Sequence, residues 1–407
     1  MPRRDQARAK RSSREWAVRG GLAALVAVLG YFCVTFSMAQ VVAATDPALA
    51  HRLAPYDGRI TARLAASLVE GEASPADRAR ADELARLALR QDPTAVLAVS
   101  TLGINAETRG DGDTARRLFA YAFKLSRRDL VTQLWSIEDA VTRGDIAGAV
   151  RHYDIALRTR PDLAQLLFPV LASASSDPAI RVPLVRTLAT KPNWGEGFIN
   201  YISGNGPDVG ATAQLFVDLR RAGVVVPLTA QASAVNALLA AGRFEEAWRY
   251  YTSIRPGSDR RRSRDPRFTA ELEAPSHLDW TPVNESGVVT SAQDGAFDFT
   301  VPASVGGPLL QQVQLLPPGT YRIAGRSSGI EQEESRRPYW TLQCRADGRE
   351  LGRVVLPNSG QASGRFLGTF SVPAGCPVQT LLLMARPVDA VSGLAGRLEQ
   401  VELVPAR

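Results

Sequence analysis

The chain has 407 residues, 45% of them hydrophobic and 22% charged, with a formal net charge of +7. Residues 1–20 carry seven basic side chains against two acidic ones, so this short arm holds most of the excess positive charge. The composition is that of a globular chain, not a disordered or collagen-like one. The nearly balanced charge beyond residue 20 argues against a basic domain that follows nucleic-acid phosphates, so we expect no nucleic-acid partner.

An uncharged segment follows the basic arm. No charged residue lies between Arg19 and Asp46, and a helix over residues 21–44 would be about 36 Å long, enough to cross a hydrocarbon core of roughly 30 Å. Because basic flanks remain on the cytoplasmic side, we predict a cytoplasmic arm at 1–20, a transmembrane anchor at 21–44 and a periplasmic remainder. The predicted location is a bacterial inner membrane, crossed once.

A cleaved signal peptide is the alternative for this segment. Ala39, Ala43 and Ala44 offer the small residues that a signal peptidase needs. The apolar run is longer than the roughly 7–15 residues of a signal peptide, which favours an uncleaved anchor that contacts the lipid bilayer. Cys33 lies within the predicted span and is expected to remain a thiol.

Small and aromatic residues recur every 34 residues in the next part of the chain. The repeating sets are Ala81, Ala115 and Ala149; Ala88, Ala122 and Ala156; and Ala85, Phe119 and Tyr153. This pattern resembles the second helix of the tetratricopeptide repeat (TPR), and residues 149–161 fit it in full. The resemblance implies an α-solenoid of helical hairpins, placed at 46–255, whose concave face binds partner proteins.

The repeat is less regular toward its end. Six prolines between residues 164 and 229 predict short helices there, and a last hairpin is expected before Arg255. Residues 256–276 contain five arginines and several Pro and Gly residues. We predict a solvated linker for this stretch, with a contact site for anions as the alternative.

Apolar residues alternate from about residue 277 onward. Nine short candidate strands predict an antiparallel β-sandwich over 277–407. Segment 315–323 and the closing strand resemble the jelly rolls of carbohydrate-binding modules. One candidate strand places Trp340, Leu342 and Cys344 on one face, and we predict a disulfide between Cys344 and Cys376, which an oxidising periplasm would preserve.

The jelly-roll resemblance implies a sugar site, in which an exposed aromatic ring stacks on the sugar and polar groups bind its hydroxyls. The candidate contacts are Tyr339, Trp340, Trp280, Arg336 and Arg337. A place in the core is the alternative for Trp280 and Trp340, because Trp340 alternates in phase with Leu342. Tyr339 and the charged loop before it are the better candidates for an exposed site.

The sequence contains no motif for nucleotide binding, metal binding or nucleophilic catalysis. Residues 111–113 resemble the opening of a calcium loop, but the remaining ligands are missing, so we predict a helix cap. His51, His152 and His277 lie in three different segments. We therefore predict a non-enzymatic protein without a cofactor.

These features predict a multidomain chain of helices followed by strands. Its expected function is a membrane-anchored periplasmic scaffold that binds periplasmic or inner-membrane proteins through TPR-like repeats. Bacterial envelope or exopolysaccharide assembly is the expected setting, with polysaccharide as a second class of ligand. The alternative is a glycan-binding module carried on a helical spacer.

Overall fold

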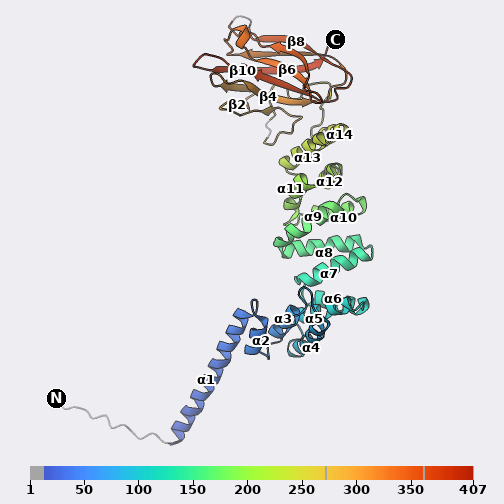
Figure 1. Cartoon of the computed structure of the whole chain (residues 1–407), viewed down its shortest axis with the longest axis vertical. Helices are drawn as coiled ribbons and strands as arrows, with labels where there is room; N and C mark the ends of the chain where they lie inside the picture. The colour runs from blue at the N-terminus through green and yellow to red at the C-terminus, as the bar shows by residue number, and fades with distance from the viewer. Residues whose placement is uncertain (1–12, 271–272, 361–362, 407) are drawn as a thin grey trace, which may run out of the picture. The chain divides into compact units, whose positions relative to one another are not determined.

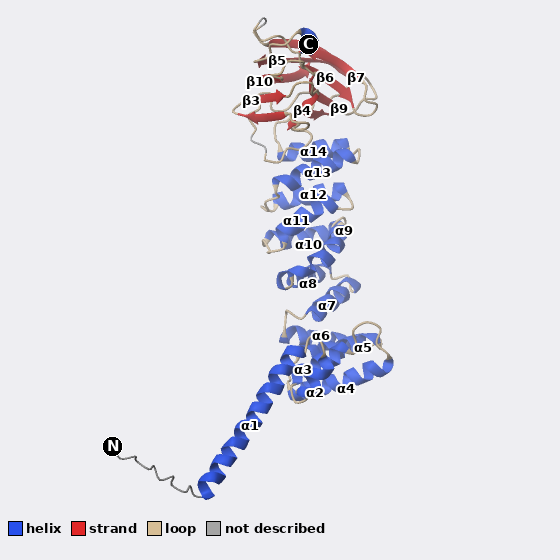
Figure 2. Cartoon of the chain, turned by 60° about the vertical axis from the view of Figure 1, so that its left-hand side comes forward, coloured by secondary structure: helices blue, strands red, loops and turns tan. Residues whose placement is uncertain are grey.

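The computed structural model describes residues 13–270, 273–360 and 363–406. Within these residues, fourteen α-helices precede ten β-strands along the chain (Figure 2), which confirms the predicted order of a helical and a β part. The chain divides into two compact units, Met1–Thr159 and Arg160–Arg407, and the solenoid predicted at 46–255 spans both. Residues 1–12 of the predicted basic arm lie outside the described residues.

Helix α1, Ser13–Val42, is long and apolar enough to cross a membrane, a property that a signal sequence shares. It begins inside the predicted basic arm, and its chain leads directly into α2, Pro47–Leu53, and α3, Gly58–Ser67 (Figure 1). Near its end, Ala39 and Ala43 are only 0% and 1% exposed. They form an apolar cluster with Ala50, Ala54 and Ile60.

The other helices of the first unit pair along the chain: α3 packs with α4, α5 with α6, and α7 with α8. Their bounds are α4 Pro75–Gln91, α5 Val96–Thr108, α6 Gly112–Leu125, α7 Leu130–Thr142 and α8 Ile146–Thr159. The cap predicted at residues 111–113 is confirmed, since the Asp111 carboxylate accepts a hydrogen bond from the Thr114 amide at 3.1 Å. Gly110 and Gly144 make the turns within two hairpins at φ of 78° and 70°, which glycine adopts without strain.

The repeat signature lies on the second helix of each hairpin. The buried members, none more than 4% exposed, are Ala81, Ala88, Ala115, Phe119, Ala122, Ala149 and Ala156. Tyr153 is half-buried, and burial raises the pKa of its hydroxyl. The helices approach closely where α5 crosses α6: a Cβ added at Gly103 would lie 2.8 Å from the Phe119 ring.

Replacing Gly103 by alanine is expected to destabilise the first unit by about 1 kcal/mol. Overpacking costs about 1–3 kcal/mol, whereas the better helix propensity of alanine returns at most about 1 kcal/mol. The matched control is Gly112→Ala, because a Cβ there would meet only the end of Arg116 at 3.6 Å. Thermal unfolding of both purified variants, followed by circular dichroism, tests this; equal Tm values would contradict a close approach.

The helices of the second unit are 11 to 13 residues long, and short helices are what the prolines of residues 164–229 predict for the first four of them. They are α9 Ala164–Ala174, α10 Pro178–Ala189, α11 Gly195–Asn205, α12 Val209–Arg221, α13 Leu228–Ala240 and α14 Phe244–Ile254. Pro178 occupies the first turn of α10, while Pro169 and Pro183 lie inside α9 and α10. A proline at the first turn loses no helical hydrogen bond, but one in the interior does.

Ten antiparallel strands form two five-stranded sheets in the same unit. The orders are β1-β4-β9-β6-β7 and β2-β3-β10-β5-β8. The bounds are β1 Thr281–Pro282, β2 Val289–Gln293, β3 Ala296–Val301, β4 Gly307–Gln314, β5 Gly319–Ser328, β6 Tyr339–Cys344, β7 Glu350–Val355, β8 Arg365–Val372, β9 Gln379–Ala385 and β10 Leu394–Pro405. From β3 to β10 the strands are distributed over the two sheets in the order of a jelly roll, so the predicted sandwich is confirmed.

The core face predicted for the strand at 339–346 is found in β6, although Thr341, on the other face, is also buried at 1% exposure. Trp340, Leu342 and Cys344 are 0%, 0% and 1% exposed and face the opposite sheet. Cys344 forms the predicted disulfide with Cys376. The bridge connects the end of β6 to the segment just before β9, which pairs with β6 in the same sheet.

The arginine-rich stretch at 256–276 differs from the solvated linker that its composition predicts. The amide of Ser263 donates to Leu403 at 3.0 Å and the amide of Val401 donates to Pro266 at 2.8 Å, so the stretch lies along β10. Phe268 is 4% exposed within the β core, and Arg264 is 7% exposed. The prediction is wrong here because carbonyl and amide oxygens of the β part satisfy the guanidinium of Arg264.

Candidate functional site

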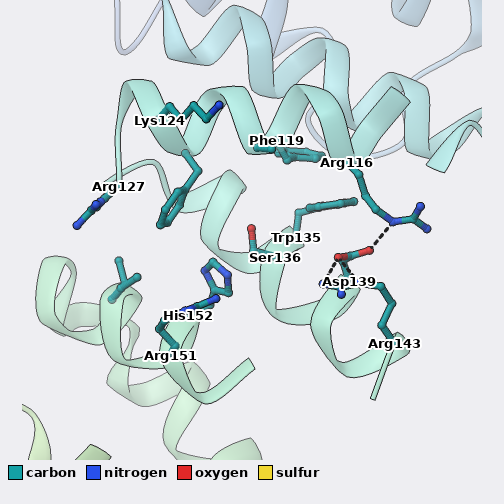
Figure 3. A pocket seen from close by; sticks show the side chains of 13 residues that line it. Arg116, Phe119, Lys124, Arg127, Trp135, Ser136, Asp139, Arg143, Arg151 and His152 are labelled. Carbon is teal, nitrogen blue, oxygen red and sulfur yellow. Dashed lines mark hydrogen bonds and ion pairs between the residues drawn. The ribbon is translucent and has the colours of Figure 1, made fainter. Parts of the chain in front are cut away.

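A cavity of about 720 Å³ opens in the first unit between α6, α7 and α8. Figure 3 shows its lining, which combines aromatic rings, several basic side chains and one carboxylate. Pockets of this size accommodate a small ligand or a short peptide segment. We refer to this cavity as the α6–α8 groove.

Two aromatic pairs form the apolar wall of the groove. Phe119 and Trp135 stack with ring centroids 4.3 Å apart, and Phe123 meets His152 edge-on at 5.6 Å. The indole of Trp135 donates to Glu107 at 3.1 Å, which fixes the ring on its outer side. Phe119 occupies the aromatic position of the repeat, so the packing that holds the hairpin also supplies the wall.

The lining contains five cationic side chains and a single carboxylate, Asp139. Asp139 accepts hydrogen bonds from Arg116 at 3.0 Å and is paired with Arg143 at 2.8 Å. The hydrogen bond to Asp139 is the main cause of a raised pKa at Arg116. Asp139 therefore neutralises charge in one part of the groove only.

The other three cations of the lining are Lys124, Arg127 and Arg151. All three are exposed, and none makes an ion pair with another residue that the structure describes. The guanidinium of Arg127 lies 5.7 Å from the centre of the Phe123 ring, a cation–π contact that leaves its charge uncompensated. The groove therefore presents unpaired positive charge beside an aromatic wall.

His152 belongs to the wall and is held there by a hydrogen bond. Its Nδ1 lies 2.9 Å from the side-chain oxygen of Gln133, whose amide nitrogen donates to the Arg127 carbonyl at 2.9 Å. Burial, followed by the charge of Arg151, lowers the pKa of His152 below its ordinary value, so the ring is neutral at pH 7. Among the described residues, no group of three metal-binding side chains exists.

The predicted sugar contacts of the β part do not form an exposed aromatic platform. Trp340 is fully buried and Trp280 is 5% exposed, with the Trp280 indole donating to Asp265 at 2.9 Å. These two tryptophans are core residues, so their assignment as ligand contacts is wrong. Their centroids lie 5.8 Å apart inside the sandwich.

Tyr339 is half-buried at the start of β6. The guanidinium of Arg353 lies 4.3 Å from its ring centre and that of Arg386 lies 4.8 Å away, so protein groups already contact the ring. Arg336 is paired with Asp389 at 2.7 Å, and Arg337 is paired with Glu334 at 3.4 Å. A sugar stacking on Tyr339 would have to displace an arginine.

Sequence reasoning predicted a concave binding face but did not select the groove residues. Each cation of the groove is an ordinary exposed helix residue when considered alone. One signal was present: Arg109 and Arg143, like Arg117 and Arg151, are separated by the 34-residue repeat. Only the packing of α6 against α7 and α8 shows which of them share one cavity.

No protein-family model and no curated protein matches this chain. Among solved structures it is similar to the Glycosylation Associate Protein (Gap123) complex from Streptococcus agalactiae, with 12% identity, a TM-score of 0.22, and coverage of 31% of this chain and 41% of that chain. It is also similar to PilW, described as a widely conserved type IV pilus biogenesis factor, with 18% identity, a TM-score of 0.26, and coverage of 50% and 95%.

A third solved structure, Naa15/Naa10 bound to HypK, is 16% identical over 55% of this chain and 36% of that chain, with a TM-score of 0.27. This chain spans less than half of the Gap123 and Naa15/Naa10 chains that it matches. Likeness at these TM-scores assigns neither an activity nor a partner.

Proposed function

We propose that this protein is a non-enzymatic, membrane-anchored scaffold that binds an acidic segment of a partner protein in the α6–α8 groove. The observation that carries the proposal is the set of three unpaired cations, Lys124, Arg127 and Arg151, beside the aromatic wall. Unpaired cations attract a carboxylate-rich segment, and the rings bury its apolar side chains. The expected partners are periplasmic or inner-membrane proteins of the bacterial envelope.

Retention of α1 as an anchor is supported by its packing. A signal peptidase cutting after Ala39 or Ala44 would have to open the helix end and the turn after it, where Ala39 and Ala43 are almost completely buried. Removal would also expose the small apolar cluster around Ala50, Ala54 and Ile60. The disulfide between Cys344 and Cys376 supports an oxidising compartment for the remainder of the chain.

The glycan-binding alternative has less support. Its two tryptophan candidates are buried, and Tyr339 is in contact with two arginines. A role in exopolysaccharide assembly would therefore depend on the protein that binds in the α6–α8 groove. Polysaccharide would bind to that partner, or to a surface of this chain other than the one around Tyr339.

Reversing two groove charges is expected to weaken binding of an acidic peptide about tenfold. Each exposed ion pair contributes about 0.2–1 kcal/mol, and a reversed charge adds repulsion of similar size. Arg127→Glu/Arg151→Glu should therefore cost about 0.8–4 kcal/mol in binding free energy, a range that includes the 1.4 kcal/mol of a tenfold change in affinity. The probe is a short fluorescent peptide of glutamate and phenylalanine, and its anisotropy is measured with the full chain in detergent.

The matched control variant is Arg90→Glu/Arg117→Glu, which changes the net charge equally at exposed positions outside the groove lining. A control peptide has glutamine in place of glutamate. Binding should weaken as salt is raised, because exposed charges are screened. Equal affinity for the two peptides, or equal losses in the two double variants, would refute the groove as an acidic-segment site.

A further inference from the structure

The turn between α2 and α3, residues 54–57, lies against the side of α1. The ring of Tyr56 meets the ring of Phe32 edge-on, with centroids 6.0 Å apart. Phe32 lies far from the end of α1 at Val42, so Tyr56 extends back along the helix toward its N-terminal half. Both rings keep a large outward surface, with Phe32 48% and Tyr56 49% exposed.

This contact has a consequence for the membrane if α1 spans it, as the proposed function requires. Arg19 is the last charged residue of α1. A hydrocarbon core of about 30 Å needs about 20 helical residues, so a core that begins after Arg19 extends to about Ala39. At about 1.5 Å per residue, Phe32 lies about 20 Å into that core, and Tyr56 lies beside it.

Moving α1 outward to release Tyr56 from the lipid is costly. The core would then have to contain Arg14, Glu15 and Arg19, the last two of which pair at 2.8 Å. A charged side chain costs up to about 2.5–3.5 kcal/mol at the centre of the membrane, whereas a tyrosine has an apolar ring whose polar tip can extend toward the headgroups. Immersing the Tyr56 ring is therefore the lower-energy arrangement.

Two backbone polar groups of the turn have partners within the protein, as lipid requires, because unpaired polar groups are expensive there. Pro55 has no amide hydrogen, and its carbonyl accepts a hydrogen bond from the Gln91 side chain at 2.8 Å. The amide of Asp57 donates to Ala54 at 3.2 Å. The carboxylate of Asp57 accepts a hydrogen bond from the Gln40 side chain at 3.1 Å. Because both side chains are polar, we place this pair at the level of the headgroups and water, closer to the end of α1 than Phe32.

We propose that the α2–α3 turn is an interfacial membrane contact, with the Tyr56 ring inserted among the lipid chains of the outer leaflet and Asp57 at the headgroups. The inference rests on the proposed role of α1 as an anchor. Its consequence is that the first unit is held against the membrane surface by two attachments, α1 and this turn. The α6–α8 groove then has a fixed height and orientation relative to the bilayer.

Environment-sensitive fluorescence in vesicles tests this. The full chain with Cys33→Ala and Tyr56→Cys is labelled with nitrobenzoxadiazole and reconstituted in phosphatidylethanolamine–phosphatidylglycerol vesicles. The matched control is Tyr121→Cys, since Tyr121 is an exposed tyrosine of the same unit at 45%. We expect doxyl lipids to quench position 56 at least about threefold more than position 121, and aqueous iodide to do the reverse.

Pro55→Cys provides a second labelled position, and circular dichroism checks that each variant is folded. Iodide quenching of positions 55 and 56 equal to that of position 121 would overturn the inference. Label on the native Cys33 reports on the anchor separately. If Cys33 is shielded from iodide while position 56 is accessible to it, the proposed membrane contact of the turn is refuted and the anchor stands. If Cys33 is also accessible to iodide, the proposed role of α1 as an anchor is refuted.

Discussion

Arg264→Ala is expected to destabilise the second unit by about 3 kcal/mol. The guanidinium donates to the Leu278 carbonyl at 2.8 Å and to the Gln314 side chain at 2.9 Å, and it also donates to the Val313 carbonyl. Removing it leaves three buried acceptors without donors, and each such group costs about 1–3 kcal/mol. This loss of stability is partly offset, because the alanine variant no longer has to bury a positive charge, which itself costs free energy.

The guanidinium remains charged at neutral pH although it is buried. Desolvation lowers the pKa of Arg264 to about 10, and the nearby Tyr251 and Asp279 act in the opposite direction. Tyr251, on α14, donates to Asp279 at 2.7 Å, and the hydroxyl of Ser276 donates to the same carboxylate at 2.7 Å. Arg264 is thus part of a polar network that joins the last helix to the β part.

Two variants separate lost hydrogen bonds from lost volume. Arg264→Met fills the space without donors and should lose nearly as much stability as Arg264→Ala. Arg267→Ala is the matched control, because Arg267 is an exposed arginine of the same stretch and should change stability by less than about 0.5 kcal/mol. Urea unfolding of the purified chain gives the free energies; a methionine variant as stable as the wild type would contradict this role.

Replacing both disulfide cysteines by serine is expected to cost roughly 3–4 kcal/mol. The bridge spans a sequence separation of 32 residues, and the chain-entropy model gives this magnitude for a loop of that length. Both residues are buried, at 1% and 2% exposure, so the hydroxyls of Cys344→Ser/Cys376→Ser would also need new partners. Thermal unfolding with and without reductant measures the effect.

The same cysteines report on the compartment in cells. Whole cells are acid-quenched and the chain is then treated with a thiol-reactive polymer. In an oxidising periplasm only Cys33 should react before reduction, and Cys344 and Cys376 should react afterwards. Modification of all three without reduction would contradict a periplasmic location for the β part.

The sequence predicted those features that depend on periodic packing. Alanines at the 34-residue spacing, such as Ala115 and Ala149, are buried because hairpins can stack closely only on small residues. The alternation of Trp340 and Leu342 correctly indicated the core face of β6, because side chains on a strand point to opposite faces in turn. The order of helices and strands followed from these two periods.

Features that depend on distant partners were not predictable. Arg264 stands in an arginine-rich stretch that resembles solvated surface, and its acceptors come from residues 14 and 50 positions away. The groove cations are dispersed from Arg116 to Arg151, and nothing local distinguishes them from other exposed arginines. The contact of Tyr56 with Phe32 likewise depends on how α2 and α3 fold back on α1.

Site-specific photo-crosslinking in living cells tests the scaffold function most directly. Benzoylphenylalanine is placed at Ala120, an exposed residue of the groove lining, and at Arg90 outside it as the control. We expect a discrete protein adduct at position 120 that is absent at position 90 and lost in Arg127→Glu/Arg151→Glu. No adduct at position 120, or an adduct that survives the double charge reversal, would contradict it.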